Sequence, residues 1–246
     1  MWFPEIGALL DMTDGDVAMM ANVHDPQAGD VRGAAFNTLA RESKAWFLAH
    51  RTRSRSVATL LGKSRIVAEY VVDFERDGEA FDLPVAVVVD KGRDLLDVRI
   101  YHSQYPLLGT HTVRPPTLPP DVRANPSGIV DEYFNALAAG DAERVVECYE
   151  LDGYFREPSG ARYAHRGRDV LLPFYRFMFS AGGGIPLRHC TVTEDAKTCA
   201  VEYVCDRWGS HDLPPQAGVA IYVRGPNGLI ASAHIYDDVS APLTGS

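Results

Sequence analysis

The second half of the chain opens with hydrophobic residues spaced three and four positions apart. They follow Asn125-Pro126 and precede Gly140, and they are Ile129, Val130, Tyr133, Phe134 and Leu137. This spacing places them on one face of a helix, so the pattern predicts a helix over 127–139.

Two further helices are predicted from capping residues. Asp141 can accept a hydrogen bond at the start of a helix that runs through Tyr149. Asp169 can cap a third helix, which continues to about Phe179 and ends at the glycines 182–184. This half therefore begins with helices.

The pattern then changes to runs rich in Val, Tyr, Ile and Ala. These runs, at 187–194, 198–207, 216–224 and 229–238, predict four strands, and Gly225-Pro226-Asn227-Gly228 predicts a hairpin between the last two. The first half shows similar strands at 65–75, 83–90 and 95–103, after a helix from about Val31 to His50. Its opening is shorter than that of the second half, which indicates truncated N-terminal helices.

The two halves repeat each other. Ala68-Glu69-Tyr70-Val71-Val72-Asp73 matches Val201-Glu202-Tyr203-Val204-Cys205-Asp206. Three more pairs of short segments match: 82–84 with 212–214, 99–101 with 234–236, and 32–33 with 166–167. The offset stays between 130 and 135 residues, which indicates a tandem duplication.

A proline-rich segment separates the halves. It contains four prolines, which lack amide donors and favour extended geometry: Pro115, Pro116, Pro119 and Pro120. We therefore expect a first domain over 1–110, a linker over 111–125 and a second domain over 126–246.

Composition limits the classes of partner. The net charge of −9 argues against nucleic acid, whose phosphates are bound by clustered Lys and Arg. The short cluster of Arg51, Arg53 and Arg55 is interpreted as a solvated helix C-terminus. No apolar run approaches the ~20 residues of a membrane span, and the N-terminus lacks a basic signal-peptide region. We expect no membrane association and a cytoplasmic location.

The cysteines give no sign of a metal site. All four, Cys148, Cys190, Cys199 and Cys205, lie in the second half without a CxxC motif or a His-rich partner segment. We interpret them as free thiols in a reducing compartment. His165 and His234 have no ligand partner at helical or turn spacing, so both are expected at a surface or an interface, and no metal is predicted.

The second half resembles a known superfamily. The segment Tyr154-Phe155-Arg156-Glu157-Pro158, then His165-Arg166-Gly167-Arg168-Asp169 and Phe174-Tyr175, is similar to an acid-Pro, Arg-Gly-Arg, Phe-Tyr signature. That signature and the order of elements resemble the nuclear transport factor 2-like superfamily, in particular the SnoaL-like polyketide cyclases and ketosteroid isomerases. The resemblance spans 126–243. It implies an α+β fold of two tandem cone-shaped barrels, each with helices packed on a curved antiparallel sheet.

The resemblance also implies catalytic positions. Tyr133 falls where ketosteroid isomerases keep an oxyanion-hole tyrosine, and Glu157 falls on their general base, usually an aspartate. The third family residue, a protonated aspartate, aligns with Ala220, which cannot donate a hydrogen bond. This departure argues against a steroid isomerase as such.

Strand parity offers a replacement acid. Ala233 and Ile235 are the apolar members of an alternating strand pattern and should point into the cone. Asp237 lies two residues beyond Ile235, so its side chain should point the same way. Asp237 could therefore be an acid of raised pKa that faces Glu157 across a substrate.

The first half keeps fewer of these groups. Asp25 occupies the acid-Pro position and His102 the counterpart of Asp237, but Ala8 stands where the second half has Tyr133. We predict Asp25 as a further catalytic candidate. The predicted substrate contacts are Phe174, Phe177, Ala220, Ile235 and His102.

Three functions remain open at this point. The first is a cofactor-independent isomerase, cyclase or dehydratase acting on a small hydrophobic carbonyl compound such as a polyketide. The second is an epoxide-opening enzyme that uses Glu157 and Asp237 as paired carboxylates. The third is a non-catalytic binding or assembly module.

A row of outward-facing side chains bears on assembly. Four residues alternate with the inward-facing ones of their strands and form a group too aromatic to be left wholly in water: Arg99, Tyr101, His234 and Tyr236. We therefore expect the halves to form an intramolecular pseudo-dimer, and a further homo-oligomer is possible.

Overall fold

The computed structural model describes residues 21–242 apart from 28, 33, 77, 93 and 94. The chain divides into two units, Met1–His102 and Ser103–Ser246. The predicted truncated opening and Ala8 lie outside the described residues. Among the described helices, none is long and apolar enough to cross a membrane.

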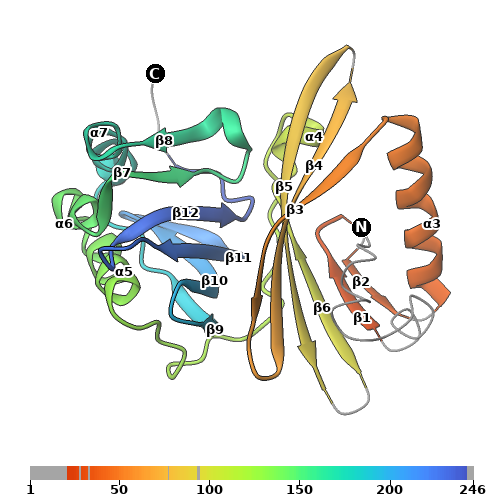
Figure 1. Ribbon diagram of the computed structural model, residues 1–246, viewed down its shortest axis with the longest axis horizontal. Coiled ribbons are helices and arrows are strands. Elements are labelled where there is room, and N and C mark those ends of the chain that lie inside the picture. Colours follow the sequence, from red (N-terminus) through yellow and green to blue (C-terminus); the bar gives the residue numbers. More distant parts are fainter. Residues whose placement is uncertain (1–20, 28, 33, 77, 93–94, 243–246) are drawn as a thin grey trace. The chain divides into compact units, whose positions relative to one another are not determined.

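The described part of the first unit is one mixed sheet and one long helix (Figure 1). Along the chain its strands and helix are β1 (Ala21–Asp25), β2 (Gly29–Arg32), α3 (Ala34–Ala49), β3 (Arg53–Leu61), β4 (Arg65–Arg76), β5 (Glu79–Lys91) and β6 (Leu96–Tyr101). The strand order in space is β2-β1-β6-β5-β4-β3, and only β1 and β6 pair in parallel.

The second unit has a sheet of the same strand order, together with several helices. Its main elements are α4 (Tyr105–Leu108), α5 (Ile129–Ala139), α6 (Ala142–Glu147), β7 (Tyr149–Arg156), β8 (Ala164–Arg166), α7 (Arg168–Met178), β9 (Arg188–Glu194), β10 (Thr198–Trp208), β11 (His211–Arg224) and β12 (Ile230–Tyr236). The strand order is β8-β7-β12-β11-β10-β9, again with one parallel pair, β7 and β12. The predicted antiparallel sheets are therefore mixed.

Strand register shows that the two units are copies of one fold. Tyr70 of β4 lies opposite Val85, and its repeat partner Tyr203 of β10 lies opposite Gly218. The parallel pairs correspond as well, because β1 and β6 align in the first unit as β7 and β12 do in the second. Two tandem cone-like α+β domains are therefore confirmed.

Most predicted helix boundaries hold within a few residues, with one correction to a predicted cap. Asp141 caps α6 as predicted, since its Oδ1 accepts from the Arg144 amide at 3.0 Å. Asp169, in contrast, lies in the first turn of α7, and Gly167 is the N-cap residue. Gly167 has a φ of 87°, which a side-chain-bearing residue rarely adopts.

The arginine cluster was interpreted wrongly. Helix α3 ends at Ala49, and Arg51 turns the chain with a φ of 50°. Arg53 and Arg55 then lie on β3, and Arg55 forms a two-bond ion pair with Asp73 on β4. Arg55 therefore pairs with a carboxylate on the neighbouring strand and does not mark the end of a helix.

The segment predicted as a linker runs along the second unit. The carbonyl of Arg114 accepts from the Ala217 amide at 2.9 Å, and the Asp121 amide donates to the His189 carbonyl at 2.9 Å. Extended, proline-rich chain suits this path because it needs few backbone partners of its own. The segment therefore forms part of the wall of this unit.

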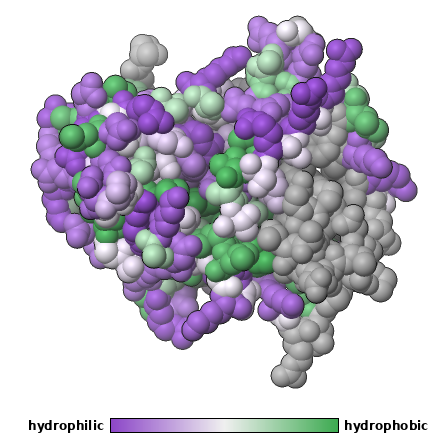
Figure 2. Space-filling view, in the orientation of Figure 1, coloured by the Kyte–Doolittle hydropathy of each residue, from purple (hydrophilic) through white to green (hydrophobic). Residues whose placement is uncertain are grey.

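Hydrophobic side chains of the second unit gather between α5, α6, α7 and the inner face of the sheet. They include Val130, Val145, Leu171, Val201 and Ala233, all fully buried. The face of this unit seen in Figure 2 is mainly hydrophilic, with scattered hydrophobic residues. The helices and the sheet do not close completely on each other, and the space they leave is the candidate site.

Candidate functional site

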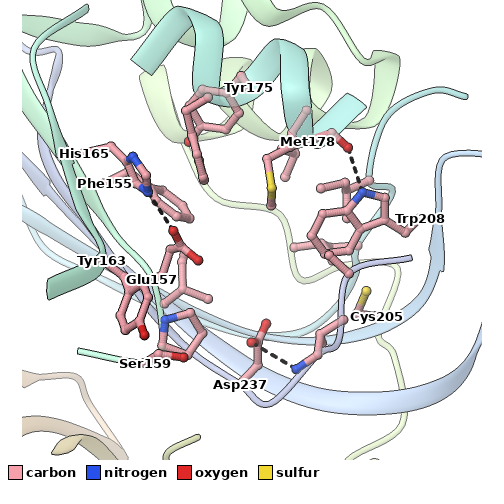
Figure 3. A pocket seen from close by; sticks show the side chains of 18 of the residues that line it. Phe155, Glu157, Ser159, Tyr163, His165, Tyr175, Met178, Cys205, Trp208 and Asp237 are labelled. Atoms are coloured by element: carbon pink, nitrogen blue, oxygen red, sulfur yellow. Dashed lines mark hydrogen bonds and ion pairs between the residues drawn. The ribbon is translucent and has the colours of Figure 1, made fainter. Parts of the chain in front are cut away.

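A cavity of about 480 Å³ opens within the second unit (Figure 3). Aromatic and aliphatic side chains make up most of its lining, including Phe155, Met178, Trp208 and Ile235. The Trp208 Nε1–H donates to the Met178 carbonyl at 2.8 Å, which ties the sheet to the end of α7. An apolar pocket of this size with a few polar groups is typical of a small-molecule site.

Glu157 is the first polar group of the cavity. It lies one residue beyond β7, and its Oε1 is 2.6 Å from His165 Nε2 on β8. His165 stacks on Phe174 of α7, with ring centroids 3.9 Å apart. The paired strands and the stacked ring hold the carboxylate in place (Figure 3). The interpretation of His165 as a surface or interface residue is therefore wrong.

Asp237 is the second carboxyl group. Its Oδ2 accepts from the Tyr203 hydroxyl at 2.7 Å. Burial raises the pKa of Asp237 to about 6, although the hydrogen bond from Tyr203 opposes this shift. The side chain keeps some exposed surface because the cavity reaches it, while protein atoms exclude bulk water. About half of this carboxyl group therefore holds its proton at pH 6, where an exposed aspartate would be almost fully ionised.

Gly218 makes room for the Tyr203 ring. The two residues lie opposite each other on β11 and β10. A Cβ at Gly218 would lie 2.6 Å from the Tyr203 ring, so any larger residue would displace the phenol. This glycine sets the position of the hydroxyl that reaches Asp237.

Three tyrosines form a buried chain of hydroxyl groups beside the cavity. The Tyr175 hydroxyl lies 3.0 Å from that of Tyr133 and 2.8 Å from that of Tyr149. Of the three, Tyr133 and Tyr175 line the cavity. Burial raises the pKa of Tyr133 to about 12, so this phenol keeps its proton and can donate it in a hydrogen bond.

A separate hydrogen bond holds the backbone of Tyr149. Arg168, at the start of α7, donates from Nε to the Tyr149 carbonyl at 2.8 Å. The Arg-Gly-Arg motif thus anchors the strand that carries Tyr149. Each hydroxyl can polarise the next, which strengthens a hydrogen bond from the phenol at the cavity end.

The predicted substrate contacts fall into two groups. Phe174, Phe177 and Ile235 line the cavity, whereas Ala220 is fully buried in the sheet core and is not a lining residue. The structure places Glu157, Tyr133 and Asp237 around the same space. Their roles stay predictions.

The first-unit candidates lie elsewhere. Asp25 ends β1, and its Oδ1 accepts from the Gln27 amide at 2.8 Å, so the side chain supports its own turn. His102 is buried at the end of the first unit. Neither is a lining residue of the cavity in the second unit.

Sequence reasoning missed several polar groups of this site: His111, Tyr149, His165, Tyr175 and Tyr203. Tyr203 could have been found, because it shares inward parity with Val201 and Cys205 on one strand. Among the described residues, no group of three or more His, Cys, Asp or Glu side chains is arranged to hold a metal ion.

Comparisons with known proteins agree with the fold. Residues 130–233 match the model of the SnoaL-like domain family. Comparison with curated proteins found no match.

Solved structures were compared as well. A putative polyketide cyclase from Sinorhizobium meliloti is 20% identical, with 44% of this chain and 92% of that chain covered and a TM-score of 0.37. The epoxide hydrolase/cyclase-like enzyme SalBIII, described with pyran ring formation in the polyether salinomycin, is 20% identical, with 46% and 90% covered and a TM-score of 0.39. A SnoaL-like protein of unknown function from Burkholderia thailandensis is 13% identical, with 44% and 90% covered and a TM-score of 0.37.

The family model covers the segment from α5 to β12, which builds most of the cavity. The first unit repeats the sheet order and register of this segment. Residues 130–233 therefore match the SnoaL-like domain family, and the first unit repeats the strand order of the sheet that they form.

Proposed function

We propose that the second unit is a cofactor-independent enzyme that moves protons on a small hydrophobic compound bearing a carbonyl group. The reaction would be an isomerisation, a cyclisation or a dehydration. One observation carries the proposal: a carboxylate, a carboxyl group that retains its proton near pH 6 and a phenol line the same apolar cavity. Proton transfer between such groups needs no other chemistry.

Glu157 is the base in this scheme. It takes a proton from the carbon next to the substrate carbonyl, and His165 holds its carboxylate in one orientation. The carbonyl oxygen gains negative charge as the C–H bond breaks. Tyr133, supported by Tyr175, donates a hydrogen bond to this oxygen, as an oxyanion donor does.

Asp237 supplies a second donor. A protonated carboxyl group in an apolar site can donate a hydrogen bond to an enolate, which an ionised carboxylate cannot. Because this donor is lost as Asp237 ionises, activity should fall as the pH rises through about 6. This group replaces the donor that is missing at Ala220.

The raised pKa of Asp237 also favours a second candidate function, epoxide opening. Protonated Asp237 would give its proton to the epoxide oxygen, and Glu157 would take a proton from the attacking hydroxyl or water. In this case Tyr133 would be of minor importance. The third possibility, a binding module, predicts ligand binding without any exchange of protons.

Solvent hydrogen exchange tests these alternatives without knowledge of the natural substrate. The protein is incubated in D₂O with cyclic enones, and NMR follows deuterium entry next to the carbonyl. Glu157→Gln should reduce exchange by about 100- to 10,000-fold and Tyr133→Phe by about 100- to 1000-fold. Asp25→Asn, which changes the equivalent acid of the first unit, is the matched control and should leave exchange unchanged.

The outcomes separate the functions. Opening of model epoxides that Asp237→Asn abolishes and Tyr133→Phe spares would favour the epoxide reaction. Saturable ligand binding without exchange or epoxide opening would favour the binding module. Exchange that persists in Glu157→Gln and is lost in Asp25→Asn would refute the assignment to the second unit.

A further inference from the structure

The segment before the SnoaL-like domain brings one more titratable side chain to the cavity. His111 follows α4 and is a lining residue of the same space as Glu157 and Asp237. Its Nδ1 lies 2.9 Å from Oδ1 of Asp238, which follows β12. The family match begins only at residue 130, so this histidine lies outside it.

Asp238 is built to hold the histidine. Its side chain is only 3% exposed, and besides His111 it accepts from the Ser103 hydroxyl at 2.6 Å and the Thr112 amide at 2.7 Å. These two donors come from the same segment as His111, on either side of it. They fix the carboxylate, which in turn keeps the hydrogen on Nδ1 and leaves Nε2 as the ring nitrogen available to a ligand.

The ring is also fixed from its side. Tyr105 of α4 stacks on His111, with centroids 4.9 Å apart, and meets Tyr163 edge to face. All three rings line the cavity. Ser103 and Thr112 already donate hydrogen bonds to the Asp238 carboxylate. A histidine that served only as a partner of this carboxylate would not need its ring to be held by Tyr105 as well.

The charges that face His111 are negative. The hydrogen bond that His111 donates to Asp238 is the largest cause that raises the pKa of His111 above its ordinary value, and the charges of Asp238, Asp237 and Glu157 add to it. Partial burial opposes this shift. These negative groups therefore favour the imidazolium form of His111, which is the form that can donate a proton.

We propose that His111 is a catalytic general acid of this cavity, positioned by Asp238, which protonates a hydroxyl group that leaves a β-hydroxy carbonyl substrate. The proposal rests on the proposed function and selects dehydration among its reactions. Glu157 takes the proton from the carbon next to the carbonyl, and the C–H electron pair forms the new C=C bond. The C–O pair departs with the hydroxyl group, which takes the Nε2 proton of His111 and leaves as water. A proton then passes from Glu157 to His111 through water, which restores both groups.

An NMR titration with 2-naphthol, a phenol that mimics the enolised substrate, tests this assignment. The Cε1–H signal of His111 is followed in the full-length protein, before and after naphthol is added. We expect the free protein to titrate above the ordinary histidine value and Asp238→Asn to lower that pKa. Naphthol should shift the signal, and its affinity should fall about 10- to 100-fold in His111→Gln, as for loss of a hydrogen bond from a charged group.

His211→Gln is the matched control, because His211 is exposed on β11 and does not line the cavity. Naphthol affinity should be unchanged in this variant. Binding to the wild-type protein that leaves the His111 signal unmoved would overturn the role of His111 and leave the proposed function standing. No binding to the wild-type protein would overturn both. The wild-type titration decides between these outcomes even if a variant fails to fold.

Discussion

The raised pKa of Asp237 makes a quantitative prediction about stability. Burial raises this pKa from 3.8 to about 6 in the folded protein, whereas the unfolded chain exposes the carboxyl group to water. Between pH 4 and 6 the unfolded state therefore loses a proton that the folded state retains. The contribution of Asp237 is fully present below pH 4 and is lost as the pH rises through 6.

The size of the effect follows from the two pKa values. A difference of about two pH units corresponds to about 3 kcal/mol, at 1.36 kcal/mol for each unit. Asp237→Asn keeps an acceptor for the Tyr203 hydroxyl but cannot ionise. The free energy of unfolding of the variant should therefore gain about 3 kcal/mol on that of the wild type between pH 4 and pH 7.

Urea unfolding of both proteins at several pH values measures this difference. The other acids titrate in both proteins, so their contributions cancel. Asp152→Asn, which removes an exposed carboxylate of the same unit, is the control variant. A flat difference for Asp237→Asn would refute the reasoning, because it would mean that Asp237 ionises like an exposed carboxyl group.

Other predictions test the groups around the cavity. Gly218→Ala should displace the Tyr203 ring and lower the free energy of unfolding, measured in urea, by about 1–3 kcal/mol. Loss of the hydrogen bond from Tyr203 should also raise the pKa of Asp237 in a carboxyl NMR titration, and an unchanged pKa would contradict the steric argument. Tyr175→Phe should break both hydroxyl contacts and cost about 1–3 kcal/mol, and deuterium exchange should fall with it if Tyr133 needs this support. The pseudo-dimer also stays a prediction: light scattering should give the mass of one chain if duplication has replaced dimerisation, and twice that mass would indicate a homodimer.

The fold could be predicted because its signals are local and repeated. The apolar spacing of α5, the turn at 225–228 and the matched Glu-Tyr-Val segments each indicate one element, and the constant offset joins them into two copies. Strand β3 could not be found in this way. Its residues are exposed at nearly every position, so no alternation marks it.

The site was only partly predictable because its polar pairs join distant segments. Parity alone indicated Asp237, since the alternation of β12 continues one residue past its end. The partner of Glu157 could not be inferred, because His165 becomes its neighbour only when β8 folds back on β7. His111 is a stronger case: it meets Asp238 across 127 residues of sequence.

The two copies differ at the residue that lies opposite their shared tyrosine. Tyr70 and Tyr203 occupy the same register position, but Tyr70 lies opposite Val85 and Tyr203 lies opposite Gly218. In the second unit, Gly218 leaves room for the Tyr203 ring, whose hydroxyl reaches Asp237. The residue opposite the shared tyrosine thus differs between the two copies, a distinction that a repeat detected by similarity does not reveal.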